Sequence, residues 1–182
     1  KRVRGGTWVG GRYREQATMT PEEIATMALE RAERERGAAK GPTQRSIMVG
    51  DPRAAGRVIS YLLRPANARS IQQGRSFWAD KLGETVASDK LTIVDDPLVP
   101  RGSNSRPFDG EGIAAKRMPL IEAGVLKNLY VDTYYGRKAG LTPTTGSSSN
   151  RIVEGGDKDL AALLSEAGSG IYITGWLGGN AD

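Results

Sequence analysis

The sequence contains neither histidine nor cysteine among its 182 residues. Zinc sites in proteins are built mainly from these two residue types, so a zinc site here would need ligands that are all oxygen, which is uncommon. A Ser-His-Asp triad is excluded, because no histidine is present to activate a serine. The missing cysteine also excludes disulfide bonds, which fits a reducing compartment.

Long apolar runs are also missing. No run approaches the roughly 20 residues that a membrane-spanning helix requires, and no secretory signal sequence begins at Lys1. We therefore expect no membrane partner. The glycine pairs near the N-terminus do not lie in a strand–turn–helix frame, so no dinucleotide-binding fingerprint is present either.

The composition is that of a folded domain, with 38% hydrophobic and 26% charged residues. The formal net charge of +5 has its basic excess in residues 1–75. Acidic and basic residues alternate over residues 30–36, which is typical of a solvated helix face. Charge alone is a weak sign of nucleic-acid binding, and we prefer the helix-face interpretation.

Hydrophobic periodicity and turn residues predict an α+β fold rather than a wound parallel sheet. Thr20 and Glu23 form a candidate capping box, Asp157 is a candidate cap, and Ala123-Gly124 is a hairpin signal. We expect Phe77 and Trp78 in the core. The expected helices cover residues 21–36, 52–63, 134–139 and 158–167, and the expected strands cover 46–49, 91–94, 118–122, 125–132 and 171–174, with a further strand or loop at 5–13.

Two acidic motifs are candidates for chemistry. Asp95-Asp96-Pro97 stands at the end of an expected strand, where such a motif is more often a turn and capping device than a functional site. Asp109-Gly110-Glu111-Gly112 has carboxylates suited to a hard cation but lacks the ligand repeat of an EF-hand. Its glycines permit close backbone approach, so the motif is equally suited to frame a peptide groove.

Several segments, taken together and in order, resemble the TldD/PmbA family, bacterial proteins once called modulators of DNA gyrase. The matching segments are GRSFWADKLGETVASDKLTIVDDP (74–97), PFDGEG (107–112), LIEAGVLKNLYVDTYYGRKAG (120–140), TTG (144–146) and GIYITGWLGGNAD (170–182). The resemblance implies mixed helices with a curved antiparallel sheet, in a fragment of a longer chain. Residues 1–45 would form the junction with the family's N-terminal domain, and residues 46–182 the first part of its C-terminal domain.

The family is understood as intracellular metallopeptidases that act on unstructured peptides as a two-subunit assembly. The TldD-type subunit carries an HExxxH helix that binds the metal, and the PmbA-type (TldE-type) subunit lacks it. A gapless count places this motif on residues 59–64, with Ile59 and Arg64 at the histidine positions and Ser60 at the glutamate position. The resemblance thus implies a cytoplasmic, non-catalytic subunit without catalytic or metal-binding residues, and zinc or iron in a TldD-type partner. Self-association is the alternative to such a partner.

We predict a cleft for an extended, unstructured peptide at two glycine-bearing segments. Asp109 and Glu111 would then bias the cleft against acidic peptides, or would merely pair with Arg106. The candidate cleft residues are Asp109, Gly110, Glu111, Gly112, Thr145 and Gly146.

Other interpretations stay open from the sequence. The glycine-bearing loop alternatively only caps the sheet. Different classes of function are a stand-alone peptidase or hydrolase that uses the carboxylates of residues 95–111, and a non-enzymatic scaffold or nucleic-acid-associated protein.

Overall fold

The structure is a computed structural model that describes residues 19–176. The chain divides into two compact units, residues 1–44 with 100–103 and residues 45–99 with 104–182. In the first unit, helix α1 (Pro21–Arg34) begins with the predicted capping box, in which Thr20 and Glu23 exchange side-chain to backbone hydrogen bonds. The segment 5–13 lies outside the described residues, and the division into family domains at residue 45 stays a prediction.

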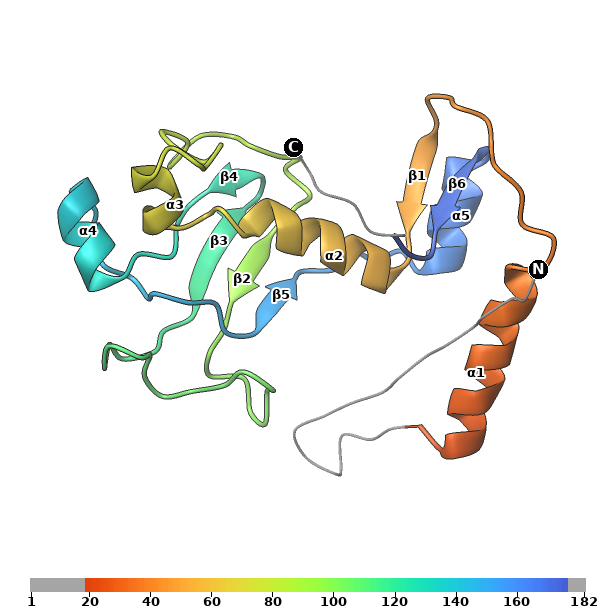
Figure 1. The fold of residues 1–182 in the computed structure, drawn as a ribbon, viewed down its shortest axis with the longest axis horizontal. Coiled ribbons are helices and arrows are strands. Elements are labelled where there is room, and N and C mark those ends of the chain that lie inside the picture. The colour runs from red at the N-terminus through yellow and green to blue at the C-terminus, as the bar shows by residue number, and fades with distance from the viewer. Residues whose placement is uncertain (1–18, 177–182) are drawn as a thin grey trace. The chain divides into compact units, whose positions relative to one another are not determined.

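The second unit is built around a four-stranded antiparallel sheet (Figure 1). Its strands are β2 (Ile93–Asp95), β3 (Met118–Glu122), β4 (Val125–Leu126) and β5 (Arg151–Val153), in the order β4-β3-β2-β5. This sheet confirms the α+β prediction. Strand β5 was not expected from the sequence, because its three exposed residues follow a long Ser/Thr/Gly loop without an alternating apolar pattern.

The turn between β3 and β4 confirms the predicted hairpin. Ala123 and Gly124 both have positive φ angles, of 45° and 78°, as a tight hairpin turn requires. A Cβ atom on Gly124 would lie only 2.4 Å from the carbonyl oxygen of Ala87, so glycine is required there. The prediction of a strand over 125–132 is wrong beyond Leu126, since the backbone then turns and forms hydrogen bonds with residues 66–68. In that contact Tyr130 donates its N–H to Ala66 and accepts from Ala68.

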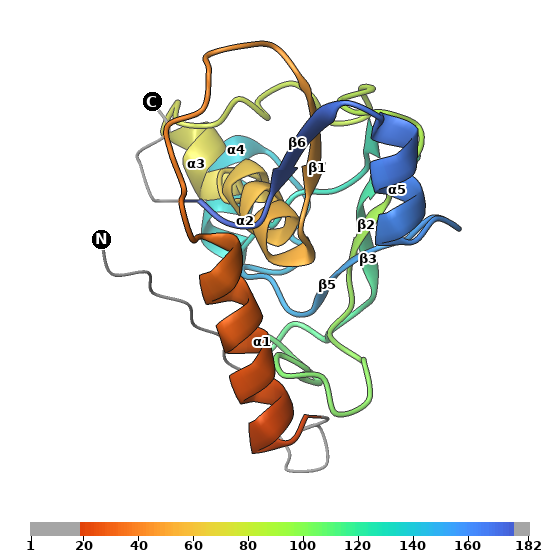
Figure 2. The same cartoon turned by 90° about the vertical axis from the view of Figure 1, so that its right-hand side faces the viewer.

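A separate two-stranded parallel pair joins β1 (Ile47–Gly50) to β6 (Gly170–Ile173). Figure 2 shows the two strands side by side, and helix α5 (Leu160–Ala167) contacts both of them. The sequence predicted both strands but not their pairing, because partners more than 100 residues apart leave no local pattern. The cap of α5 is Asp159, not the predicted Asp157, and Asp159 accepts from the N–H of Ala162 at 2.8 Å.

Helix α2 (Pro52–Leu63) leads into the core of the second unit. Two shorter helices, α3 (Ala68–Gln72) and α4 (Thr133–Ala139), contact each other. Trp78 is buried as predicted and donates its indole N–H to the carbonyl of Leu62 at 2.7 Å. Phe77 is 58% exposed, so the prediction that it is a core residue is wrong. The buried core around Trp78 includes Leu63, Ile93, Leu120, Ile121, Leu126, Leu129 and Val131.

Within residues 19–176, no helix combines the length and the apolar character that crossing a bilayer would need.

Candidate functional site

Asp109 connects the two glycine-bearing segments that the sequence placed at a cleft. One carboxylate oxygen accepts from the N–H groups of Glu111 (2.9 Å) and Ile113 (3.0 Å), which closes a tight local turn. The other accepts from the hydroxyl of Thr145 at 3.1 Å and from the N–H of Gly146 at 3.4 Å. The side chain is buried, so these four donors replace water around its charge.

The surroundings of Asp109 keep it ionised. Burial acts to raise the pKa of the carboxyl group, but the hydrogen bonds from Ile113, Glu111, Gly146 and Thr145 outweigh that effect and lower the pKa below its ordinary value. A carboxylate already held by four protein donors is poorly placed to accept a proton from a substrate or to bind a cation.

The carboxylate of Glu111 also accepts hydrogen bonds from protein donors. Its two oxygens accept from the hydroxyl of Thr133 at 2.6 Å and from the N–H of Thr133 at 2.9 Å. The neighbouring Asp132 is the N-cap of α4 and accepts from the N–H of Tyr135 at 2.6 Å. In the part of the chain that the structure describes, no group of three acidic, histidine or cysteine residues is arranged to hold a metal ion.

These carboxylates border an open groove of about 360 Å³, called here the acidic groove. It contains four of the six predicted cleft residues. Of the other two, Gly112 takes a positive φ of 78° in the turn, and Thr145 lines a neighbouring cavity. The acidic groove is lined by Asp109, Gly110, Glu111, Asp132, Tyr134, Gly146 and Ser147.

Arg106 does not pair with the carboxylates of the acidic groove. Its guanidinium donates instead to the carbonyls of Ser147 (2.6 Å) and Ser148 (3.3 Å), and it contacts the hydroxyl of Thr145 at 3.4 Å. This arginine therefore fixes the backbone of residues 145–148. The suggestion that Arg106 neutralises Asp109 or Glu111 is wrong on this geometry.

Asp95 is a buried structural carboxylate, which the sequence had suggested either as a turn and capping residue or as one of the carboxylates of a hydrolase. It is 1% exposed and accepts from the N–H and hydroxyl of Ser149, at 2.8 and 2.7 Å, and from the Tyr130 hydroxyl at 3.1 Å. Burial, reinforced by the negative charge of Asp95, raises the pKa of the Tyr130 hydroxyl. Asp96 is the turn residue that was predicted, and it accepts from the N–H of Leu98.

The distribution of these carboxylates argues against a hydrolase that uses residues 95–111. Asp95 is surrounded by three donors, Asp109 by four and Glu111 by two. A general base must instead lie within hydrogen-bond reach of a substrate proton. The geometry therefore indicates that these side chains stabilise the fold rather than act on a substrate.

A second polar groove lies beside α2, at the position where the resemblance placed the metal helix. It has a volume of about 290 Å³ and shares Gly146 and Ser147 with the acidic groove. Ser60 and Arg64 lie one helical turn apart and both line it, whereas Ile59 packs against the hydrophobic core. We call it the basic groove; it is lined by Ser60, Leu63, Arg64, Asn67, Tyr130, Gly146, Ser147, Ser148 and Arg151.

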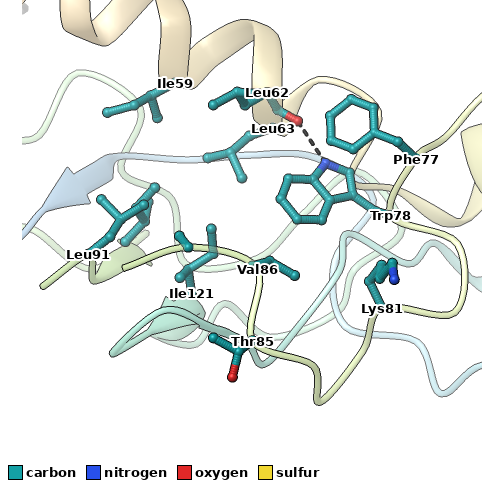
Figure 3. Close-up of a pocket in the computed structure, with 12 residues that line it drawn as sticks. Ile59, Leu62, Leu63, Phe77, Trp78, Lys81, Thr85, Val86, Leu91 and Ile121 are labelled. Atoms are coloured by element: carbon teal, nitrogen blue, oxygen red, sulfur yellow. Dashed lines mark hydrogen bonds between the residues drawn. The ribbon is translucent and has the colours of Figure 1, made fainter. Parts of the chain in front are cut away.

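An apolar pocket of about 360 Å³ lies on another side of α2 (Figure 3). Ile59, Leu62 and Leu63 reach it from the helix, and Trp78 forms part of its wall. Lys81 is the charged residue among those that line it. Helix α2 thus offers an apolar surface on one side and the polar pair Ser60 and Arg64 on the other.

Comparison with known proteins gives concordant matches. The family model described as PmbA/TldA metallopeptidase C-terminal domain matches residues 43–182. A metalloprotease of Methanothermobacter thermautotrophicus is 34% identical over 173 residues, which cover 88% of this chain and 38% of that protein. The metalloprotease PmbA of Escherichia coli O157:H7 is 27% identical over 161 residues, which cover 87% and 36% of the two chains.

A solved structure has the same fold. It comes from Bacteroides thetaiotaomicron and is named as a candidate modulator of DNA gyrase, and it matches with a TM-score of 0.85 and 39% identity. The match covers 90% of this chain and 37% of that chain. The present chain therefore spans less than two-fifths of the length of each of these three proteins.

Proposed function

The chain belongs to the PmbA/TldD metallopeptidase family, and from this premise we propose that it is a non-catalytic, PmbA/TldE-type subunit. Its role would be to support a catalytic TldD-type partner and to shape a cleft for unstructured peptides. The partner would carry the HExxxH helix and the zinc or iron. Self-association of this subunit is the alternative assembly.

The identity of the residues on α2 is the observation that carries this proposal. The resemblance places the two metal ligands of a catalytic relative at positions 59 and 64 and its general base at position 60. Ile59 is apolar and packs into the core, Ser60 has no carboxylate, and Arg64 brings a positive charge. These residues do not fit a divalent metal ion, and a sequence without histidine or cysteine offers no substitute of the usual kind.

The acidic groove supports the peptide part of the proposal. Gly110 and Gly146 leave its walls without side chains at two points, so the backbone of an extended peptide has room to approach. Because the neighbouring carboxylates accept hydrogen bonds from backbone and threonine donors, the groove keeps its shape without a ligand. Fixed, preformed walls lower the ordering cost of binding.

Reconstitution with a TldD-type paralogue that carries HExxxH tests the proposal. The full-length subunit should co-purify with that paralogue, and metal analysis should find zinc or iron only in preparations that contain it. Replacing the glutamate of the paralogue's motif should abolish peptide cleavage by the mixture. Metal bound stoichiometrically to this subunit alone, or cleavage by this subunit alone, would contradict a non-catalytic role.

A further inference from the structure

We propose that the basic groove binds a carboxylate group of the peptide, at the position where a catalytic relative would hold its metal. The inference rests on the proposed function, since it assumes that this subunit contacts the peptide. It adds the chemical class of the group that is recognised and the residues that recognise it.

Two arginines reach this groove from different elements. Arg64 ends α2, and Arg151 begins β5. Arg151 donates to the hydroxyl of Ser60 at 3.3 Å, a long hydrogen bond that leaves most of its five donor positions available. Over residues 19–176, the guanidinium of Arg64 forms no ion pair with a carboxylate.

The buried carboxylate of Asp95 does not form an ion pair with either of these arginines. Asp95 is the cross-strand neighbour of Arg151, but its oxygens accept hydrogen bonds from Tyr130 and Ser149 and form no ion pair with Arg64 or Arg151. Arg106 is likewise directed to the carbonyls of Ser147 and Ser148. Within residues 19–176, neither Arg64 nor Arg151 is therefore bound directly to a carboxylate.

This arrangement matches the chemistry of a carboxylate. Guanidinium groups bind carboxylates through short, charge-assisted and often bidentate hydrogen bonds, and the Ser60 hydroxyl adds a further donor. Such a carboxylate would come either from the C-terminus of a peptide or from an aspartate or glutamate side chain. From the basic groove, a peptide would continue over Gly146 and Ser147, which also line the acidic groove.

Fluorescence anisotropy with three labelled peptides tests the inference on the full-length protein. All three have about ten glycine, serine and alanine residues and an N-terminal label. The first has a free C-terminal carboxylate, the second a C-terminal amide, and the third the amide with one internal glutamate. We expect the free acid to bind about tenfold more tightly than the amide, because its carboxylate forms charge-assisted hydrogen bonds. This difference in affinity should shrink as salt is added.

Arg64→Gln and Arg151→Gln should each remove most of the preference for the free acid. The matched control is Arg69→Gln, which removes the same charge from an exposed residue outside the groove and should leave the preference intact. Unfolding temperatures close to wild type would show that the effect is on binding.

The third peptide separates the two sources of the carboxylate. Tight binding of the glutamate-containing amide indicates that a side-chain carboxylate is accepted, and weak binding indicates recognition of the C-terminus. Equal affinities of wild type for the free acid and both amides would overturn the carboxylate inference but leave the peptide-binding subunit in place. Failure to bind any of the peptides would overturn both.

Discussion

The acidic groove and the basic groove share the backbone of Gly146 and Ser147, but their charged side chains are held in opposite ways. In the acidic groove, Asp109, Glu111 and Asp132 each accept hydrogen bonds from backbone N–H groups. In the basic groove, Arg151 makes one long bond to a hydroxyl, and Arg64 pairs with no carboxylate of the described residues. The carboxylates of the acidic groove therefore stabilise the fold, whereas the guanidinium groups of the basic groove can still bind a ligand.

Replacing Asp109 should produce the largest effect on stability. Asp109→Ala leaves the N–H groups of Glu111, Ile113 and Gly146 without their acceptor in a partly buried turn. Unsatisfied buried donors cost about 1 to 3 kcal/mol each, with partial relief from water, so we expect a loss of about 3 kcal/mol. Urea unfolding followed by circular dichroism would measure it.

The control for this substitution is Asp157→Ala, which removes an exposed aspartate that lies outside both grooves. It should change stability by less than about 0.5 kcal/mol. If the two variants unfold at the same urea concentration, the carboxylate of Asp109 does not hold the turn and the contrast between the grooves is lost.

Acid should weaken the same turn. Because the folded pKa of Asp109 is lowered, its ionised form adds stability that is fully present above the unfolded pKa of about 3.9. That stability is lost as the pH falls through the still lower folded pKa. The stability gap between wild type and Asp109→Ala should therefore be constant from about pH 5 to 7 and narrow below about pH 4. A gap that stayed constant down to pH 2.5 would show that the charge of Asp109 contributes nothing.

The two grooves also differ in how far the sequence revealed them. Asp109, Gly110, Glu111 and Gly146 were predicted together because glycines and acidic residues cluster in short, recognisable motifs. The basic groove was not predicted, since Ser60, Arg64 and Arg151 come from a helix and from an unexpected strand about 90 residues apart. The resemblance to a metal-binding helix pointed to Ser60 and Arg64, but only as residues that differ from the metal-binding motif.

The fold shows the same division. Helix starts such as the Thr20–Glu23 capping box were predictable because their hydrogen bonds join residues three apart. The buried cluster of Asp95, Tyr130 and Ser149 was not, because its members are 35 and 54 residues apart. Hydrogen bonds between residues close in sequence can be predicted from a short pattern. Partners across a sheet depend on the packing of the whole unit, so a local pattern does not reveal them.

A smaller effect is expected from narrowing the acidic groove without disturbing its hydrogen bonds. The Cβ of Gly110→Val would meet no atom within 4 Å, and its backbone does not need a positive φ. The valine should therefore fill part of the groove and weaken peptide binding about three- to tenfold, or about 1 kcal/mol. Anisotropy with the amidated peptide would measure the loss.

Gly155→Val is the matched control, because its Cβ also meets nothing within 4 Å and it does not line the groove. It should bind the peptide like wild type. Equal affinities of both variants would remove the acidic groove from the peptide path and leave it as a structural turn.

Among the substitutions in the two grooves, the smallest effect on stability should come from Arg64→Ala, although Arg64 is central to the basic groove. If its guanidinium has no carboxylate partner in the folded protein, its removal costs only the packing of the side-chain stem and a weak interaction with the end of α2. We expect a change in unfolding free energy of about 0.5 kcal/mol or less, measured in the same urea experiment as Asp109→Ala. A loss as large as that of Asp109→Ala would mean that the guanidinium of Arg64 stabilises the fold. The charged side chains of both grooves would then be structural, and Arg64 would not be available to bind a peptide carboxylate. A small loss of stability together with a lost preference for the free acid would show that Arg64 acts in binding rather than in folding.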